Sequence, residues 1–497
     1  MAAHPLISPL DEHNRRLIAN VHPEDWINPA PAGRYNLVVI GAGSGGLISA
    51  AVAAGLGARV ALIERNLLGG DCLNVGCVPS KAIIRAAHLA HDRGAVEDGD
   101  FRAAMERMRQ IRAQISREDS ATRYSEELSV DVYLGEGRFT GGNTIEVAGQ
   151  TLEFSKAIIA TGARAIILPI PGLAEAGALT NETVFELTER PHRVGVIGAG
   201  PIGCELAQTF RRLGSEVALF NDVSHILPRE DFDAAEIVKQ AFRREGIDLV
   251  MPGQVKEVSS GPEGKILYFE GEMRSDQITV DEIILGVGRA PNVENLGLEA
   301  AGVEFDGRNG VHVNDQLKTS NPNVYAVGDC CMQWKFTHAS DAAAKIAVQN
   351  ALFFGRKKLS DLIMPWVTYT DPEVAHVGMY ERDAEAAGIQ VDTFRVDLEH
   401  NNRAVCDGQT EGFVKIHTRK GSDKIVGAPL VGANAGNMLS EITLAMVNNL
   451  GLTKIAEVIH PYPTQSEALK AAANAYMRTK LTPTAARILK GIMRLRR

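Results

Sequence analysis

The feature that most constrains the fold of this 497-residue chain is a pattern of strand, glycine turn, helix and strand that occurs twice. The first copy spans residues 35–64, the second spans residues 192–220, and the two glycine turns are 157 residues apart. The matching glycines are Gly41, Gly43 and Gly46 in the first turn and Gly198, Gly200 and Gly203 in the second. Each copy is typical of a β-α-β unit. The sequence therefore predicts an α/β fold with two Rossmann-like domains.

Each glycine turn offers a surface for the phosphates of a dinucleotide, because glycine permits a tight turn and the following helix N-terminus attracts negative charge. Glu64 lies 23 residues after Gly41, where an acid would bind a ribose hydroxyl pair. In the second copy Asn221 fills this place and Asp222 follows it. Asp222 would repel a 2′-phosphate, and no Arg lies between Asn221 and Pro228, so the second turn favours NADH over NADPH.

The composition excludes several classes of protein. A net charge of −9 gives no overall positive field for a nucleic-acid backbone, so no nucleic-acid partner is expected. No apolar run is long enough to span a bilayer. Six cysteines are too few for a disulfide scaffold, and in a reducing compartment a CxxxxC pair is more often catalytic than structural. We therefore expect a cytoplasmic protein of roughly three domains.

Residues 69–81, GGDCLNVGCVPSK, carry the most specific signal in the chain. They follow the first β-α-β unit directly and open a helix, which places Cys77 near a helix N-terminus. The helix dipole and the unpaired N–H groups there stabilise a thiolate, lower the thiol pKa and keep the group reactive at neutral pH. Cys72 and Cys77 are therefore a candidate redox centre.

This segment resembles the redox motif of the class I pyridine nucleotide-disulfide oxidoreductases, among them dihydrolipoamide dehydrogenase, glutathione reductase and mercuric reductase. The resemblance extends over residues 35–476 and includes the segments 160–162, 286–292 and 327–329. It implies bound FAD in the first Rossmann-like domain, NADH or NADPH in the second, and a C-terminal α+β dimerisation domain. The cofactor-binding residues that it implies are Gly41, Gly43, Gly46, Glu64, Gly70, Lys81, Thr161, Gly162, Gly198, Gly200, Gly203, Asn221, Gly288, Arg289 and Asp329.

The same resemblance implies catalytic roles. Cys72 matches the thiol that exchanges with substrate, and Cys77 matches the thiol that contacts the flavin. Lys81 and Glu205 would lie beside the flavin N5, and Asp329 would bind the ribityl chain. The expected acceptor of electrons is a small molecule or a metal ion.

The chain order and the resemblance together predict five segments. These are an N-terminal arm (1–33), a discontinuous FAD-binding domain (34–185 and 290–361), an NAD(P)-binding domain (186–289), a dimerisation domain (362–478) and a basic tail (479–497). The expected assembly is a homodimer.

The C-terminal segment HPYPTQSE, residues 460–467, is similar to the family's HxHPTxSE, whose second His is the general acid-base. Tyr462 stands at that position, and a phenol with an ordinary pKa near 10 is a poor base at neutral pH. His460 matches the first His, for which a structural role and a catalytic role both stay open. Glu467 could bind Tyr462 or cap the next helix. In a homodimer, Tyr462 and Glu467 would complete the active site of the other subunit.

Tyr at this position favours the mercuric reductases, because a thiolate-bound metal ion needs ligand exchange and electrons more than a proton shuttle. Cys72 and Cys77 would then bind Hg(II) transiently as substrate, and Cys330 is a further point of similarity. Two features differ from that group: no N-terminal metal-binding domain is expected, and no Cys pair follows Glu467. The alternatives are a disulfide or thiol-compound reductase and a membrane-docked diaphorase. We interpret Cys204, Cys331 and Cys406 as packing or incidental residues.

Residues 480–497 alternate basic and apolar side chains with helical spacing. This pattern predicts a basic amphipathic helix that could rest on an anionic membrane or on a partner protein, while a solvated or dimer-packed terminal helix is the alternative. The protein could therefore be peripheral to the inner face of the membrane.

Overall fold

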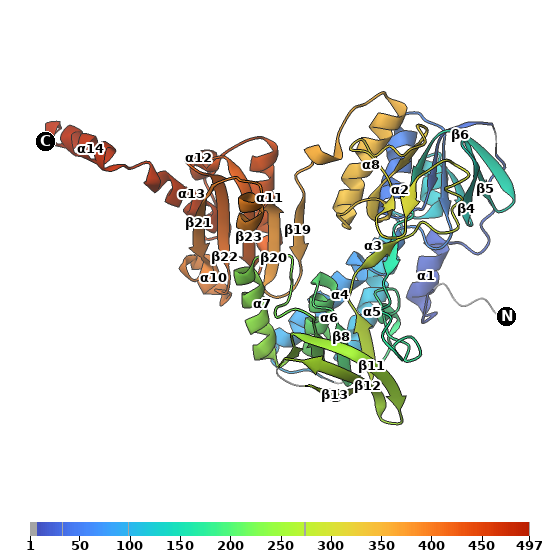
Figure 1. Ribbon diagram of the computed structural model, residues 1–497, viewed down its shortest axis with the longest axis horizontal. Coiled ribbons are helices and arrows are strands. Elements are labelled where there is room, and N and C mark those ends of the chain that lie inside the picture. The colour runs from blue at the N-terminus through green and yellow to red at the C-terminus, as the bar shows by residue number, and fades with distance from the viewer. Residues whose placement is uncertain (1–6, 32, 98, 273–274, 497) are drawn as a thin grey trace. The chain divides into compact units, whose positions relative to one another are not determined.

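The computed structural model describes residues 7–496 except 32, 98, 273 and 274 (Figure 1). Two compact units make up the chain. The first holds the chain up to Asp222 together with residues 247–362, and the second holds residues 223–246 together with residues 363–497. The segment 223–246, which the sequence assigns to the NAD(P)-binding domain, thus packs with the C-terminal unit. The five segment boundaries stay predictions.

The first β-α-β unit lies at the centre of a mixed sheet in the first unit. Its parallel strands are β3 (Asp131–Leu134), β2 (Val60–Glu64), β1 (Tyr35–Ile40), β6 (Gln150–Ile159) and β18 (Val324–Ala326), in that order. The antiparallel strands β5 (Thr144–Val147) and β4 (Gly137–Gly141) follow β6 at one edge. Helices α2 (Ser44–Gly55) and α8 (Thr337–Leu352) pack against each other beside this sheet. Every residue of β2 is buried, as expected for a parallel strand covered on both faces.

The second β-α-β unit forms a separate four-stranded parallel sheet. Its order is β10 (Asp248–Val250), β9 (Glu216–Phe220), β8 (Arg193–Ile197) and β14 (Glu282–Leu285), and α6 (Pro201–Arg212) follows β8. An antiparallel sheet of β11 (Gly253–Gly261), β12 (Gly264–Gly271) and β13 (Ser275–Val280) lies between β10 and β14 in the chain. Two short pairs, β7 (Ala163–Ala165) with β15 (Arg289–Pro291) and β16 (Phe305–Asp306) with β17 (Gly310–Val311), complete the strands of this unit. The predicted pair of Rossmann-like domains is confirmed.

The predicted N-terminal arm contains helix α1 (Glu12–Val21), which packs against α5 (Asp100–Ile115). Arg109 Nε lies 2.5 Å from Asp11 Oδ2, and Trp26 donates its indole N–H to the Val132 carbonyl. Residues 1–6 and 32 of the predicted arm lie outside the described residues. The described part of the arm is therefore docked on the first unit.

The C-terminal unit is built on an antiparallel sheet. Its order is β19 (Pro365–Thr368), β20 (Glu373–Gly378), β23 (Ile425–Gly432), β22 (Phe413–Arg419) and β21 (Val391–Asp397). Helices α11 (Ala435–Val447), α12 (Leu452–Glu457) and α13 (Glu467–Thr479) share one hydrophobic core with the sheet. Shorter helices are α9 (Glu381–Ala386) and α10 (Asn402–Asp407). This is the α+β architecture that the resemblance implies.

Within the described residues, no helix combines the length and the apolar character needed to cross a membrane.

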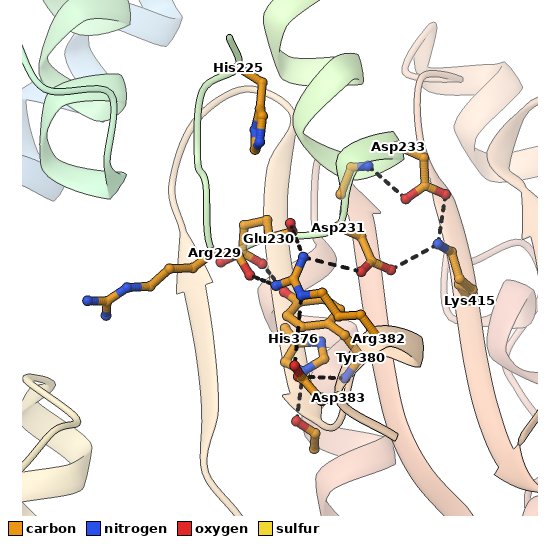
Figure 2. Close-up of polar contacts among 12 residues, drawn as sticks. His225, Arg229, Glu230, Asp231, Asp233, His376, Tyr380, Arg382, Asp383 and Lys415 are labelled. Atoms are coloured by element: carbon orange, nitrogen blue, oxygen red, sulfur yellow. Dashed lines mark hydrogen bonds and ion pairs between the residues drawn. The ribbon is translucent and has the colours of Figure 1, made fainter. Parts of the chain in front are cut away.

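A buried carboxylate holds the segment before helix α7 (Phe232–Glu245) to the sheet of the C-terminal unit (Figure 2). Glu230 is 3% exposed, and its two oxygens accept hydrogen bonds from Trp366 Nε1, at 2.9 Å, and from the Tyr380 hydroxyl. The Tyr380 ring stacks on His376 with a centroid distance of 3.6 Å. Burial raises the pKa of Glu230, and the bonds from Tyr380 and Trp366 offset part of that rise.

Two cations of the C-terminal unit, Arg382 and Lys415, bind other groups of the segment that carries Glu230. Arg382 donates to the backbone carbonyl of Glu230 at 2.8 Å, and its guanidinium lies 4.5 Å from the centre of the Tyr380 ring. Lys415 Nζ lies 3.1 Å from Asp231 and 2.7 Å from Asp233 (Figure 2). A buried polar network therefore fixes the start of α7 against the sheet.

Replacement of Tyr380 by Phe tests this network. The variant leaves one oxygen of the buried Glu230 without its hydroxyl donor, so we expect a loss of about 1–3 kcal/mol in the stability of the C-terminal unit. Thermal unfolding of the FAD-loaded protein measures the change. Tyr268→Phe, at a partly exposed position on β12, is the matched control and should change stability by less than about 0.5 kcal/mol. Equal unfolding temperatures for the two variants would contradict a stabilising role for the network.

Candidate active site

The two cysteines lie on a loop that is pressed against the first glycine turn. Gly69 and Gly70 both have left-handed backbones, with φ of +90° and +56°. A Cβ on Gly70 would lie 2.6 Å from the Cα of Gly43, so any larger residue would push the two loops apart. The close contact fixes the cysteine loop to the turn that is predicted to hold the pyrophosphate.

The loop continues into two helices that position the thiols. Cys72 lies in α3 (Gly70–Asn74), and Cys77 is the first residue of α4 (Cys77–Asp92). Cys77 Sγ lies 3.4 Å from the hydroxyl of Thr337, the first residue of α8. Cys77 therefore has the helix N-terminal position that the sequence predicts.

The two thiols differ in acidity. A hydrogen bond from Cys72, a second from Thr337 and the charge of Lys81 lower the pKa of Cys77 to about 6, although burial opposes the shift. The hydrogen bond to Cys77, burial and the negative charge of Cys77 raise the pKa of Cys72, and Asp119 adds to that rise. In the dithiol form Cys77 is therefore the thiolate at neutral pH, and Cys72 is the thiol that donates to it.

Lys81 and Glu205 form an ion pair between the two Rossmann-like domains. Lys81 lies four residues after Cys77 on α4, and its Nζ lies 2.6 Å from Glu205 Oε2 on α6. The Glu205 side chain is 8% exposed and that of Lys81 is 35% exposed. The structure brings together the two residues that the resemblance assigns to the flavin N5, and their place beside the flavin stays a prediction.

The first glycine turn has the form of a dinucleotide cradle. Gly41 has φ of +98°, and a Cβ on Gly46 would lie 1.7 Å from the Gly41 carbonyl oxygen. A Cβ on Gly43, by contrast, would meet nothing closer than 3.8 Å, and it would fill the space above the N-terminus of α2. Glu64 accepts from the backbone N–H of Ala42 at 2.6 Å, and this bond holds the carboxylate at the end of β2. Burial raises the pKa of Glu64.

A second group of predicted cofactor residues comes together where β7 pairs with β15. The Thr161 hydroxyl donates to the Asn292 carbonyl at 2.7 Å, and Arg289 donates to the Ala163 carbonyl at 2.5 Å. Gly162 and Gly288 have left-handed backbones, and a Cβ on Gly162 would meet no atom within 4 Å. These contacts hold the segment from 160 to 162 beside the segment from 286 to 292.

Arg289 connects this group to two carboxylates. Its Nη2 donates to Asp71, and its Nε lies 3.4 Å from Asp329 Oδ2. Arg289 Nε is buried and has no hydrogen-bond partner among the described atoms. Burial raises the pKa of Asp329, and Arg289 offsets part of that rise. A buried N–H donor without a partner, next to a buried carboxylate, can form a hydrogen bond to a bound ligand.

The residues present fit FAD. The resemblance puts the pyrophosphate at the first glycine turn, the ribose at Glu64 and the ribityl chain at Asp329. An open cradle lies above α2, Glu64 is buried and held in place, and the unsatisfied donor of Arg289 lies beside Asp329. Sequence reasoning did not single out Asp71, Thr337 or Asp119. The position of Asp71 directly before Cys72 was the available signal, whereas Thr337 and Asp119 reach the site only through the fold.

The second glycine turn repeats the first in detail. Gly198 has φ of +100°, and a Cβ on Gly203 would lie 1.8 Å from the Gly198 carbonyl oxygen. Asn221 Oδ1 accepts from the Ala199 N–H at 3.3 Å, as Glu64 accepts from Ala42 in the first turn. Asn221 therefore occupies, with a neutral side chain, the place in the second turn that Glu64 occupies in the first, and its contact with a ribose stays a prediction.

The C-terminal segment presents a phenol and a buried imidazole. The Tyr462 side chain is 70% exposed, and its hydroxyl accepts a hydrogen bond from Asn402 at 3.1 Å. The His460 ring is 4% exposed, and its Nε2 lies 3.1 Å from both oxygens of Glu441. Glu467 begins α13 and accepts from the backbone N–H of Thr464 at 3.3 Å; because Thr464 precedes the helix, this bond caps none of the helix N–H groups.

The other four cysteines, Cys204, Cys330, Cys331 and Cys406, form no disulfide in the structure. Cys330 is buried in the hydrophobic core of the first domain, and its thiol donates to the Val327 carbonyl at 3.3 Å. Cys204 is buried on α6, and Cys406 is exposed on α10. In the part of the chain that the structure describes, no group of three or more His, Cys, Asp and Glu side chains could hold a metal ion.

The acidity of Cys77 gives a direct test of the site. The charge-transfer absorbance of the two-electron-reduced, FAD-loaded protein reports the thiolate beside flavin, and we expect it to be half-maximal near pH 6. Thr337→Val removes one hydrogen bond to the thiolate and should raise that midpoint by about one pH unit. Thr443→Val, on α11, is the matched control. A midpoint near the ordinary thiol pKa in the unmodified protein would contradict the assignment.

Comparison with known proteins agrees with this geometry. The family model described as pyridine nucleotide-disulphide oxidoreductase matches residues 35–345, and the model of the family's dimerisation domain matches residues 364–473. The chain is 34% identical to a mercuric reductase of Acidithiobacillus ferrooxidans, over 92% of this chain and 86% of that protein. It is 35% identical to a dihydrolipoyl dehydrogenase of Thermus scotoductus, over 89% of this chain and 97% of that protein.

Solved structures give the same result. The HOCl-induced flavoprotein disulfide reductase RclA of Escherichia coli has a TM-score of 0.81 at 27% identity, over 88% of this chain and 99% of that one. FAD and NAD(P)H are the cofactors of this family, and the dimerisation-domain match supports a homodimer. The chain belongs to the pyridine nucleotide-disulphide oxidoreductases, a family of FAD-containing enzymes.

Proposed function

We propose that this enzyme reduces a thiol-bound soft metal ion, with Hg(II) as the best candidate, at the Cys72–Cys77 pair. The net reaction transfers two electrons from NADH or NADPH to Hg(II), and it yields Hg(0), the oxidised nicotinamide and one proton. Several relatives named mercuric reductase, at 32–34% identity, support this choice. The names describe those proteins, and the reaction of this chain rests on its own residues.

The observation that carries the proposal is the absence of a free imidazole from the HPYPTQSE segment. Tyr462 is an exposed phenol rather than an imidazole, and the His460 ring is buried against Glu441, so neither side chain is a ready base for a thiol at neutral pH. Disulfide exchange consumes and releases protons at each thiol. Metal transfer between thiolates needs ligand exchange, which Tyr462 can assist as a hydrogen-bond donor.

The unequal thiols suit a soft metal ion. Cys77 is already a thiolate at neutral pH and can serve as one of the two ligands without a base, beside Cys72, the thiol that the resemblance assigns to substrate exchange. Cys72 keeps its proton until the ion arrives, because the charge of Cys77 opposes a second thiolate. The positive charge of the ion then replaces the thiol proton and permits two-coordinate thiolate binding.

Bound FAD supplies the two-electron relay between the nicotinamide and the cysteines. Gly41, Gly43 and Glu64 would hold its pyrophosphate and ribose, and Lys81 with Glu205 would fix the helix that carries Cys77. At the second turn the neutral Asn221 and the following Asp222 favour NADH as donor. The enzyme would act as a homodimer in the cytoplasm, with Tyr462 and Glu467 of the partner subunit completing each site.

Steady-state oxidation of NADH and NADPH by the FAD-loaded protein, with thiol-buffered Hg(II) as acceptor, tests the proposal. We expect mercury-dependent turnover that falls by at least about a hundredfold in Cys72→Ala, since that variant removes one of the two ligands. Cys406→Ala, which removes an exposed cysteine on α10 outside the predicted redox pair, is the matched control and should retain full turnover. Flavin reduction without mercury turnover in the unmodified enzyme would sink the proposal.

A disulfide or thiol-compound reductase is the second candidate, because the dihydrolipoyl dehydrogenase relative matches almost end to end. Here a water molecule or His460 would replace the missing base. Tyr462→His distinguishes the two candidates, since it should raise lipoamide turnover by roughly tenfold or more only where proton transfer limits the exchange. An unmodified enzyme that already turns over lipoamide at a pH-independent rate, faster than Hg(II), would favour the second candidate.

A membrane-docked diaphorase, which passes electrons to a quinone or a protein, is the remaining alternative. Only the exposed basic helix at the end of the chain favours it. In a diaphorase the electrons would pass from flavin to the quinone without the dithiol. Cys72→Ala should then oxidise NADH with a quinone as fast as the unmodified enzyme does.

A further inference from the structure

Helix α14 (Pro483–Leu495) has an apolar face with no partner in its unit. None of its residues is buried, and Ile488, Met493 and Leu495 are 59%, 61% and 89% exposed. Figure 1 shows the helix extending away from the sheet of the C-terminal unit to which it belongs. Single exposed apolar residues are ordinary on protein surfaces, but a continuous apolar face marks a contact site.

The helix is fixed by its own sequence rather than by packing. The Thr482 hydroxyl accepts from the Ala485 backbone N–H at 3.2 Å, and Pro483 occupies the first helical position, where its missing N–H costs no bond. The fold therefore presents a capped helix of 13 residues without support from a core.

Apolar and basic residues lie on opposite faces of α14. Ile488, Ile492 and Leu495 recur at intervals of four and three residues, and Leu489 and Met493 widen the same face. The basic residues Arg487, Lys490 and Arg494 recur at intervals of three and four, out of phase with the apolar set. Such a helix fits the boundary between lipid headgroups and acyl chains, where its apolar face can contact the acyl chains and its basic face can bind anionic headgroups.

The charge of the tail is opposite to that of the rest of the protein. Residues 480–497 hold six of the 52 Lys and Arg residues and none of the 61 Asp and Glu residues, so the remainder carries a net charge of −15. An anionic bilayer would repel that remainder and attract the tail. A second copy of α14 could cover the apolar face, but it would leave the basic face without anions.

We propose that α14 is an interfacial anchor that binds the surface of an anionic phospholipid bilayer. Ile488, Leu489 and Ile492 enter the headgroup boundary, and Arg487, Lys490 and Arg494 remain at the phosphates. Binding is reversible because one short helix buries little apolar surface. Binding is sensitive to salt because salt screens the attraction between the basic residues and the phosphates. The contact is independent of the proposed metal reduction, since it involves neither the cysteines nor the nicotinamide.

Vesicle co-sedimentation of the full-length, FAD-loaded protein tests the anchor. We expect binding to vesicles of phosphatidylglycerol mixed with phosphatidylcholine, little binding to phosphatidylcholine alone, and release when the salt concentration rises from about 0.05 M to about 0.5 M. Ile488→Ser with Ile492→Ser should weaken the partition by more than about tenfold. Arg487→Gln, Lys490→Gln and Arg494→Gln together should weaken it by roughly tenfold to a hundredfold.

Lys420→Gln, Lys424→Gln and Lys454→Gln together form the matched control, because they change the net charge equally at exposed positions elsewhere in the same unit. This control should bind like the unmodified protein. Equal binding of the control and the α14 variants, or equal binding to neutral and anionic vesicles, would overturn the proposal. If the unmodified protein does not bind vesicles and the isoleucine variant has a lower assembly mass, the apolar face of α14 contacts a second copy of the chain. That result would also overturn the proposal.

Discussion

The contact of Gly70 with Gly43 is the constraint on which the rest of the site depends. Because the cysteine loop lies against the glycine turn, the helix that begins at Cys77 starts beside the predicted pyrophosphate position. Lys81, one turn along that helix, then reaches Glu205 on α6. One backbone contact therefore aligns the turn, the thiols and the second Rossmann-like domain, and a side chain on Gly70 would disturb all three.

The chemistry follows from unequal environments around two identical side chains. Cys77 accepts a hydrogen bond from Cys72, has a second from Thr337 and lies near the charge of Lys81, so it carries the negative charge of the dithiol. Cys72 lies next to that charge and keeps its proton. A dithiol of this kind can bind a soft cation without an external base. Disulfide exchange would need the base that the Tyr462 position lacks, and this difference is the reason that we propose metal reduction over disulfide reduction.

Local patterns in the sequence predict most of the fold and most members of the site. The glycine turns, Glu64 and the CxxxxC segment are short-range signals, and the structure repeats the same N–H bond at Glu64 and at Asn221. Thr337 and Asp119 were missed because tertiary packing alone brings them to the cysteines. The docking of residues 223–246 onto the C-terminal unit was missed for the same reason, since its buried carboxylate is paired with side chains far along the chain.

The most direct measurement is the rate at which two-electron-reduced enzyme is reoxidised by thiol-buffered Hg(II), followed by stopped flow across pH. If the Cys77 thiolate is one of the two ligands and no base is needed, the rate rises through a pKa of about 6 and is constant at neutral and mildly alkaline pH. A rate that keeps rising with pH through the ordinary pKa range of thiols would contradict the assignment of this site to metal reduction. Reoxidation by oxidised lipoamide as fast as by Hg(II) at every pH would contradict it too.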